Sequence, residues 1–258
     1  MRKSFTYASL TLSLAGFICT HAKSMTVADY FESGPQRTLA DAAANGRTGQ
    51  IADVLQRGAI VNFQGKEGMT ALIWAFLHQN KKGYENLLNN GANPNLQMTA
   101  SRLASDGVTD GNSAVSLAAM HQDPWYLEIT LKHGGNPNIV NPVRGTPVIF
   151  QCIKFLDRTD PQPRLEQLKM LINAGANLNS YDKDSFTPMM IAAILNRYDM
   201  VYIMLEAGAD PAVKTTAGTT IVDTINLIRT DPKSDLYQWR AKVIKALEAR
   251  GIVVNSHS

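Results

Sequence analysis

Apolar side chains recur along this chain in short segments with helical spacing, and a glycine follows every second segment. An apolar pair usually stands ahead of the glycine, as in Val54-Leu55 and Met204-Leu205. The intervals between these glycines are 33, 43, 41, 33 and 43 residues. A period of 33 residues with additions of eight or ten indicates stacked repeats rather than one globular core. The glycines are Gly58, Gly91, Gly134, Gly175, Gly208 and Gly251.

Each period predicts two helices joined by a turn. The first helix opens with a Ser or Thr whose hydroxyl can cap free backbone N–H groups. Alanine pairs then let neighbouring helices approach closely, and the glycine after the second helix ends it in the left-handed conformation. An Asn or Asp next supplies the turn into the following unit. The predicted openings lie at Thr70, Ser113, Thr146, Thr187 and Thr220, and the alanine pairs are Ala42-Ala43, Ala118-Ala119 and Ala192-Ala193.

Taken together, these positions resemble the ankyrin repeat, a β-turn followed by two antiparallel helices over 33 residues. The best single match runs from Asp182 to Pro211, with Thr187-Pro188 opening the unit and Gly208-Ala209-Asp210 closing it. The resemblance covers roughly residues 36 to 252. It implies an all-α ankyrin-repeat solenoid of about six helix-turn-helix units, in which the first and last units act as caps.

The chain departs from this family at the histidine that usually follows two places after the proline and bonds neighbouring turns. The residues found there are Ile73, Ser116, Ile149, Met190 and Asp223. We therefore expect the turns to be tied together by other groups.

Three additions lengthen the period. Residues near Leu96 to Asp110 enlarge one turn, and Arg158 to Pro161 and Arg229 to Pro232 lengthen two inter-helix loops. The last two additions share the sequence Arg-Thr-Asp-Pro, which we interpret as internal duplication rather than as a recognition motif.

The N-terminus has the pattern of a secretory signal peptide. Arg2 and Lys3 precede a mostly apolar run, Phe5 to Ile18, and small residues follow at Thr20 and Ala22. We predict cleavage after Ala22 or Ser24, so that residues 1–24 are a signal peptide, residues 36–258 form the repeat domain, and the mature protein is periplasmic. An uncleaved anchor or a buried helix is the alternative, but a run of about 14 residues is short for a membrane span.

The charge balance and the cysteines of the chain bear on which partners and which chemistry it can have. The chain has 25 basic and 22 acidic residues; without Arg2 and Lys3 the balance is 23 to 22. No stripe of Lys and Arg stands out, which argues against nucleic acid as a partner. Cys152 would be the one cysteine left after cleavage, and it lies in an apolar helix pattern, where a buried side chain is favoured over a nucleophile.

Catalytic motifs are missing from the sequence: there is no Gly-x-Ser-x-Gly, phosphate-binding loop, His-Glu-x-x-His or cysteine pair at metal-ligand spacing. His78 and His121 occupy equivalent places in two adjacent units, where a metal site or acid–base pair is the alternative to ordinary surface residues. Asp182-Lys183-Asp184 lacks the glycine and glutamate of a calcium loop and is interpreted as a turn. We predict no enzymatic activity, no cofactor and no metal.

The resemblance implies that the turn tips and the exposed side of the first helices form a concave surface that binds other proteins. Trp125 and Trp74 are assigned equally to this surface and to the core. The predicted partner-binding residues are Lys66, Glu67, Met69, His78, Asp110, Asn112, Met120, His121, Trp125, Tyr126, Arg144, Lys154, Lys183, Asp184 and Phe186.

The sequence therefore predicts a monomeric, periplasmic protein-binding module. In architecture and destination it resembles ankyrin-type immunity proteins that neutralise secreted antibacterial effectors, for example type VI secretion phospholipases. A second hypothesis is an accessory factor that supports a periplasmic enzyme such as a catalase. A third, from another class, is an enzyme or metal site around His78 and His121.

Overall fold

The computed structural model describes residues 25–100, 108–154, 162–227 and 235–254. The predicted signal peptide and both Arg-Thr-Asp-Pro segments lie outside these residues.

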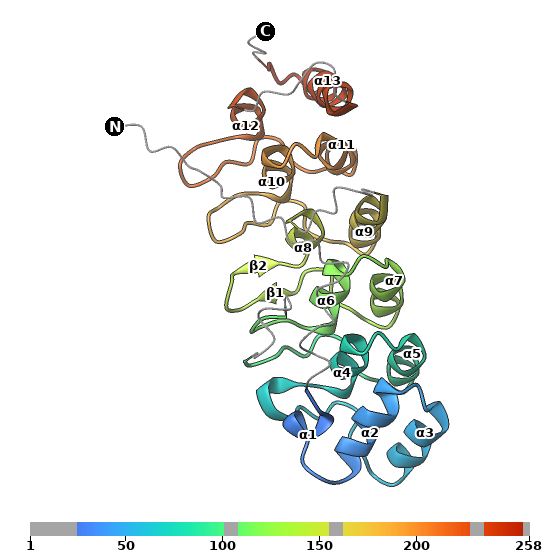
Figure 1. Cartoon of the computed structure of the whole chain (residues 1–258). Helices are drawn as coiled ribbons and strands as arrows, with labels where there is room; N and C mark the ends of the chain where they lie inside the picture. The colour runs from blue at the N-terminus through green and yellow to red at the C-terminus, as the bar shows by residue number, and fades with distance from the viewer. Residues whose placement is uncertain (1–24, 101–107, 155–161, 228–234, 255–258) are drawn as a thin grey trace.

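Twelve of the described helices form six consecutive pairs, as the glycine period predicts. In Figure 1 the first helices of the pairs stand in one row and the second helices in a row beside it. The first row contains α2 (Pro35–Ala44), α4 (Ala71–Leu77), α6 (Ala114–Met120), α8 (Ile149–Lys154), α10 (Pro188–Ile194) and α12 (Ile221–Leu227). The second row contains α3 (Thr48–Gln56), α5 (Lys81–Asn89), α7 (Trp125–Lys132), α9 (Gln162–Asn173), α11 (Tyr198–Glu206) and α13 (Asp235–Glu248).

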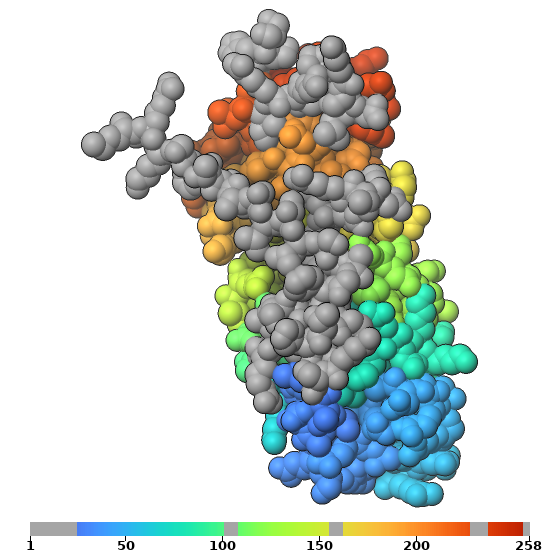
Figure 2. Space-filling model, viewed as in Figure 1, coloured from blue at the N-terminus to red at the C-terminus, as the bar shows by residue number. Residues whose placement is uncertain are grey.

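Each unit packs mainly against its neighbours. Within the first row, α2 contacts α4, α4 contacts α6 and α10 contacts both α8 and α12, while α11 contacts α13 in the second row. The molecule is accordingly elongated, and its units succeed one another from end to end (Figure 2). The apolar core is one continuous layer between the two rows, because each unit buries its apolar faces against the next.

A short helix precedes the first pair. Helix α1 (Val27–Tyr30) packs on α2 and on the 3₁₀ turn η3 (Lys66–Gly68), and its Tyr30 and the following Phe31 are each 1% exposed. The ring of Tyr30 lies 5.6 Å from that of Trp74 in α4. The ordered array thus begins ahead of residue 36.

The predicted helix ends are confirmed, and so are the predicted helix starts except the one at Thr146. The hydroxyl oxygens of Thr70, Ser113 and Thr187 each accept a hydrogen bond from the backbone amide three residues later. All six period-marking glycines have positive φ, from 76° to 94°. One start differs: Thr146–Pro147 forms strand β2, paired with β1 (Val140–Asn141), so that α8 begins only at Ile149.

Small residues set the distance between helices. The six residues of the alanine pairs are fully buried. Gly83 in α5 lies so close to α2 that a Cβ atom there would meet the backbone oxygen of Ala43 at 1.8 Å. This contact requires glycine, since any side chain would push the two helices apart.

Asparagine side chains replace the missing histidines as ties between units. Asn138 donates from Nδ2 to the backbone oxygen of Gly175 over 2.9 Å and accepts from the amide of Asn177 over 2.7 Å, so one side chain bridges two units. Asn62 and Asn95 make the same pair of bonds to the units that follow them. Asn179 accepts the corresponding amide of Asp210. We call Asn62, Asn95, Asn138 and Asn179 the asparagine ladder.

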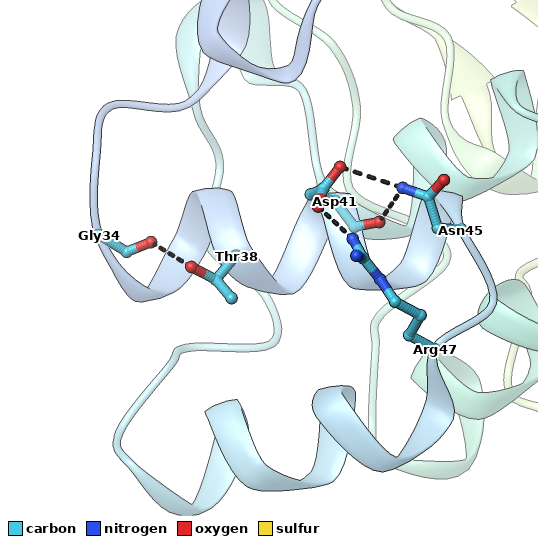
Figure 3. A network of polar contacts seen from close by, with 5 residues as sticks. All are labelled: Gly34, Thr38, Asp41, Asn45 and Arg47. Atoms are coloured by element: carbon cyan, nitrogen blue, oxygen red, sulfur yellow. Dashed lines mark hydrogen bonds and ion pairs between the residues drawn. The ribbon is translucent and has the colours of Figure 1, made fainter.

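A second polar network closes the loop of the first helix pair (Figure 3). Asn45 donates to the backbone oxygen and the carboxylate of Asp41, and Arg47, just ahead of α3, forms an ion pair with that carboxylate. Thr38 donates to the backbone oxygen of Gly34 over 3.2 Å, in the first turn of α2. The first unit is therefore held by exposed polar groups, as suits the end of a repeat array.

Candidate protein-binding surface

The loops between units form hairpins that project from one side of the first row of helices (Figure 1). Polar side chains hold their turns in shape. Asn141 accepts the amides of Val143 and Arg144 through Oδ1, and Asp182 accepts those of Asp184 and Phe186. Each hairpin is therefore a braced element that presents its tip residues in a fixed place.

Asp182-Lys183-Asp184 is one of these turns, as its sequence predicts. The Asp182 carboxylate is buried and also forms an ion pair with Lys154 at the end of α8, with Nζ and Oδ2 3.1 Å apart. This ion pair links the hairpin to the first row of helices. Lys154 therefore stabilises the hairpin while part of its side chain stays exposed.

Eleven of the fifteen predicted binding residues reach the surface. Six are exposed and five are half-buried. The exposed residues are Lys66, His78, Arg144, Lys154, Lys183 and Asp184, and the half-buried ones are Glu67, Asp110, His121, Trp125 and Phe186. They lie on the hairpins and at the ends of the first-row helices, except for Trp125, which begins α7.

For four of the predicted binding residues the prediction of an exposed position is wrong. Met69, Asn112, Met120 and Tyr126 are between 0% and 3% exposed and cannot form a partner surface. Asn112 instead braces its own turn, accepting the amide of Thr109 over 2.6 Å and donating to Ser116. The other three are buried hydrophobic residues of the core.

His121 closes the end of α6 within an aromatic cluster. Its ring lies 5.4 Å from that of Phe76 and 4.8 Å from that of Tyr126, and its Nδ1 accepts the backbone amide of Asp123 over 3.1 Å. Burial lowers the pKa of His121 below its ordinary value, and the neighbouring Asp123 only partly opposes this. Burial therefore favours the neutral form of the ring, in which Nδ1 can accept the hydrogen bond of the Asp123 amide.

Asp123 faces the same cluster. Burial alone would raise its pKa, but bonds from Lys81 and the Trp125 amide, together with the charge of Lys81, lower it below its ordinary value. Lys81 Nζ is 2.6 Å from the carboxylate and 4.9 Å from the centre of the Trp125 ring. This arrangement is a surface ion pair stacked on an aromatic ring rather than an acid–base pair.

The two tryptophans that the sequence left open are now assigned. Trp74 is 2% exposed and belongs to the core, whereas Trp125 is half-buried beneath Lys81. Cys152 is fully buried, as predicted, and burial raises the pKa of its thiol to about 12. Within the described residues no cluster of three or more His, Cys, Asp or Glu side chains could hold a metal ion.

Residues 115–215 match the family model for ankyrin repeats, in three copies. The fold of the chain is that of an ankyrin-repeat solenoid. Two solved structures agree. EF0377, an ankyrin repeat protein, is 20% identical with a TM-score of 0.62, covering 84% of this chain and 98% of its own. The ankyrin repeat domain ABAYE2397 from Acinetobacter baumannii AYE is 22% identical with a TM-score of 0.63, covering 83% and 98%.

Ankyrin repeats form modules for protein interaction, and the elongated stack of this solenoid offers the surface for it. No described helix of the solenoid has the length and apolar content needed to cross a membrane.

Sequence reasoning missed several exposed apolar residues on the hairpins of this ankyrin solenoid. Val140, Val143 and Tyr181 are 45%, 67% and 48% exposed. A signal was present, because Val140 and Tyr181 each stand six places after a period-marking glycine, where the first two hairpins carry glutamine.

Proposed function

We propose that this ankyrin solenoid is a non-catalytic protein-binding module of the bacterial periplasm, and that a secreted antibacterial effector is its partner. The observation that carries the proposal is the placement of exposed charged and apolar side chains along the hairpins, outside a continuous buried core. Surfaces of this kind bind other proteins, because turns whose backbone is already braced by hydrogen bonds lose little backbone conformational entropy on association.

Two further observations support a binding role over a catalytic one. The thiol of Cys152 is buried and its raised pKa disfavours the thiolate, so it is a poor nucleophile. His121 already accepts a backbone amide inside an aromatic cluster. The periplasmic location rests on the basic start, apolar run and small residues of the first 24 positions.

Site-specific photo-crosslinking in the producing bacterium tests the proposal. A photoreactive residue in place of Arg144 or Lys183 should give a covalent adduct with one protein of the periplasmic fraction. Matched controls replace Glu128 in α7 and Lys169 in α9, which are exposed on second-row helices. Adducts from the control positions alone, or from none of the four, would contradict binding by the hairpins.

The identity of the crosslinked protein then separates the roles. A toxic enzyme that loses activity when the solenoid is added would support neutralisation. An endogenous enzyme whose activity is retained or increased would instead favour an accessory role, and recovery of the chain in the cytoplasmic fraction would remove the periplasmic part of the proposal.

A further inference from the structure

Three large apolar side chains are exposed together on two consecutive hairpins. Val140 and Val143 belong to the β1–β2 hairpin, and Tyr181 to the next one. Burying such side chains in a complex removes apolar surface from water and so favours association. We call Val140, Val143 and Tyr181 the hairpin patch.

The two hairpins are held side by side. Asn138, just before the first, is bonded to Gly175 and Asn177, just before the second. At the tips, a Cβ atom on Gly145 would lie 3.8 Å from the Cβ of Lys183. Val140 and Tyr181 occupy the same repeat position, so the ladder sets them in line along the solenoid.

The apolar character of this position is confined to these two units. The equivalent residues are Gln64, Gln97 and Lys214 elsewhere in the described chain. The glutamines bond along the same line: Gln64 donates to the backbone oxygen of Gln97, and Gln97 donates to that of Val140. The line of polar side chains therefore gives way to exposed apolar ones at the middle of the solenoid.

Basic residues surround the hairpin patch. Arg144 and Lys183 are exposed on the two hairpins of the patch, against one exposed carboxylate, Asp184; Asp182 is already paired with Lys154, and on the fifth hairpin the exposed Lys214 is matched by the exposed Asp210. The charge around the patch thus favours an acidic partner.

We propose that the hairpin patch binds an acidic protein segment that packs at least one large apolar side chain against Val140, Val143 or Tyr181. This inference rests on the proposed function and specifies the chemistry of its partner. Apolar contacts would supply the affinity, while Arg144 and Lys183 would orient the acidic residues.

The test uses the whole chain as the target for selection from a displayed library of random peptides. The expected winners carry a net negative charge and at least one large apolar residue. Their affinity should fall about tenfold or more with Val143→Asp or Tyr181→Asp, and with the double change Arg144→Glu and Lys183→Glu. Leu227→Asp is the matched control, since this apolar side chain is 80% exposed on α12, away from the patch.

Every outcome decides the proposal. No enrichment, enrichment of basic peptides, or peptides insensitive to the patch variants would overturn it. Binding that is lost instead with His78→Ala would leave a protein-binding module but refute this site. Binding to anionic vesicles that the patch variants abolish would assign the patch to membranes. Envelope crosslinks absent from all positions, with acidic peptides still selected, would contradict the proposed function alone.

Discussion

The buried packing of His121 should make the stability of the fold depend on pH. Its folded-state pKa is lowered by burial, whereas the unfolded chain has a value near 6.5. The unfolded state therefore binds more protons below about pH 6.5, and the free energy of unfolding should fall as pH decreases from there. The groups facing the ring are Phe76, Tyr126, Asp123, Lys81 and Arg164.

Urea unfolding of the native chain and of His121→Gln, between about pH 7.5 and 5, measures this effect. The variant should have a shallower dependence of stability on pH in that range. The lowered pKa of Asp123 acts in a separate window, since its contribution is lost only as pH falls below the ordinary aspartate value. Parallel curves for the two proteins would refute the role of His121.

Cys152 should be unreactive in the folded protein. The thiol is buried and its pKa is raised to about 12, so the thiolate that reacts with iodoacetamide is scarce and shielded. Mass spectrometry of the peptide containing Cys152 should show labelling in denaturant and almost none in native buffer. Rapid labelling under native conditions would contradict the buried environment.

Single residues also show how far sequence reasoning extends. The glycines, the alanine pairs and the hydroxyl caps other than Thr146 were predicted correctly, because each follows from local backbone conformation or size. Exposure was harder to predict. Met120 and Tyr126 were assigned to the surface and are buried, while Val140 and Tyr181 were overlooked and are exposed. Burial depends on what neighbouring units cover, and repeat spacing alone does not contain that information.

At the scale of elements, Gly83 controls how closely α5 packs on α2. Alanine normally stabilises a helix relative to glycine by up to about 1 kcal/mol. At this position the added Cβ would lie 1.8 Å from the Ala43 backbone oxygen, so Gly83→Ala should destabilise the fold by about 1–3 kcal/mol or more. Helix propensity alone predicts stabilisation and the close contact predicts destabilisation, so the sign of the change in stability decides between them.

The matched control is Gly49→Ala in α3, where nothing lies within 4 Å of an added Cβ. This variant should be neutral or more stable by up to about 1 kcal/mol in thermal or urea unfolding. If the two substitutions changed stability equally, the close approach of α5 to α2 would be wrong.

The period of the glycines was enough to predict six helix pairs and their order. It did not predict α1, because four residues are too short for a helical apolar pattern. Nor did it predict that one unit opens with strands, since Thr146-Pro147 satisfies the helix-start pattern equally well.

For the whole molecule, the asparagine ladder should set how strongly neighbouring units are coupled. Asn138→Ala removes two hydrogen bonds that join the third hairpin to the start of the fourth and should cost about 1–2 kcal/mol. Because units of a solenoid are stabilised by their interfaces, the unfolding transition should also broaden. Asn173→Ala, at the exposed end of α9, should change stability by less than about 0.5 kcal/mol. Equal effects would show that the ladder does not couple the units.

The asparagine ladder has a consequence for how such a chain can diverge. Its rungs join equivalent backbone positions whether the sequence between successive glycines spans 33 residues or 43. Insertions between rungs therefore leave the distance from one hairpin to the next unchanged. Mutations can therefore lengthen loops and exchange tip residues during evolution, while the spacing of the hairpins that a ligand contacts is retained.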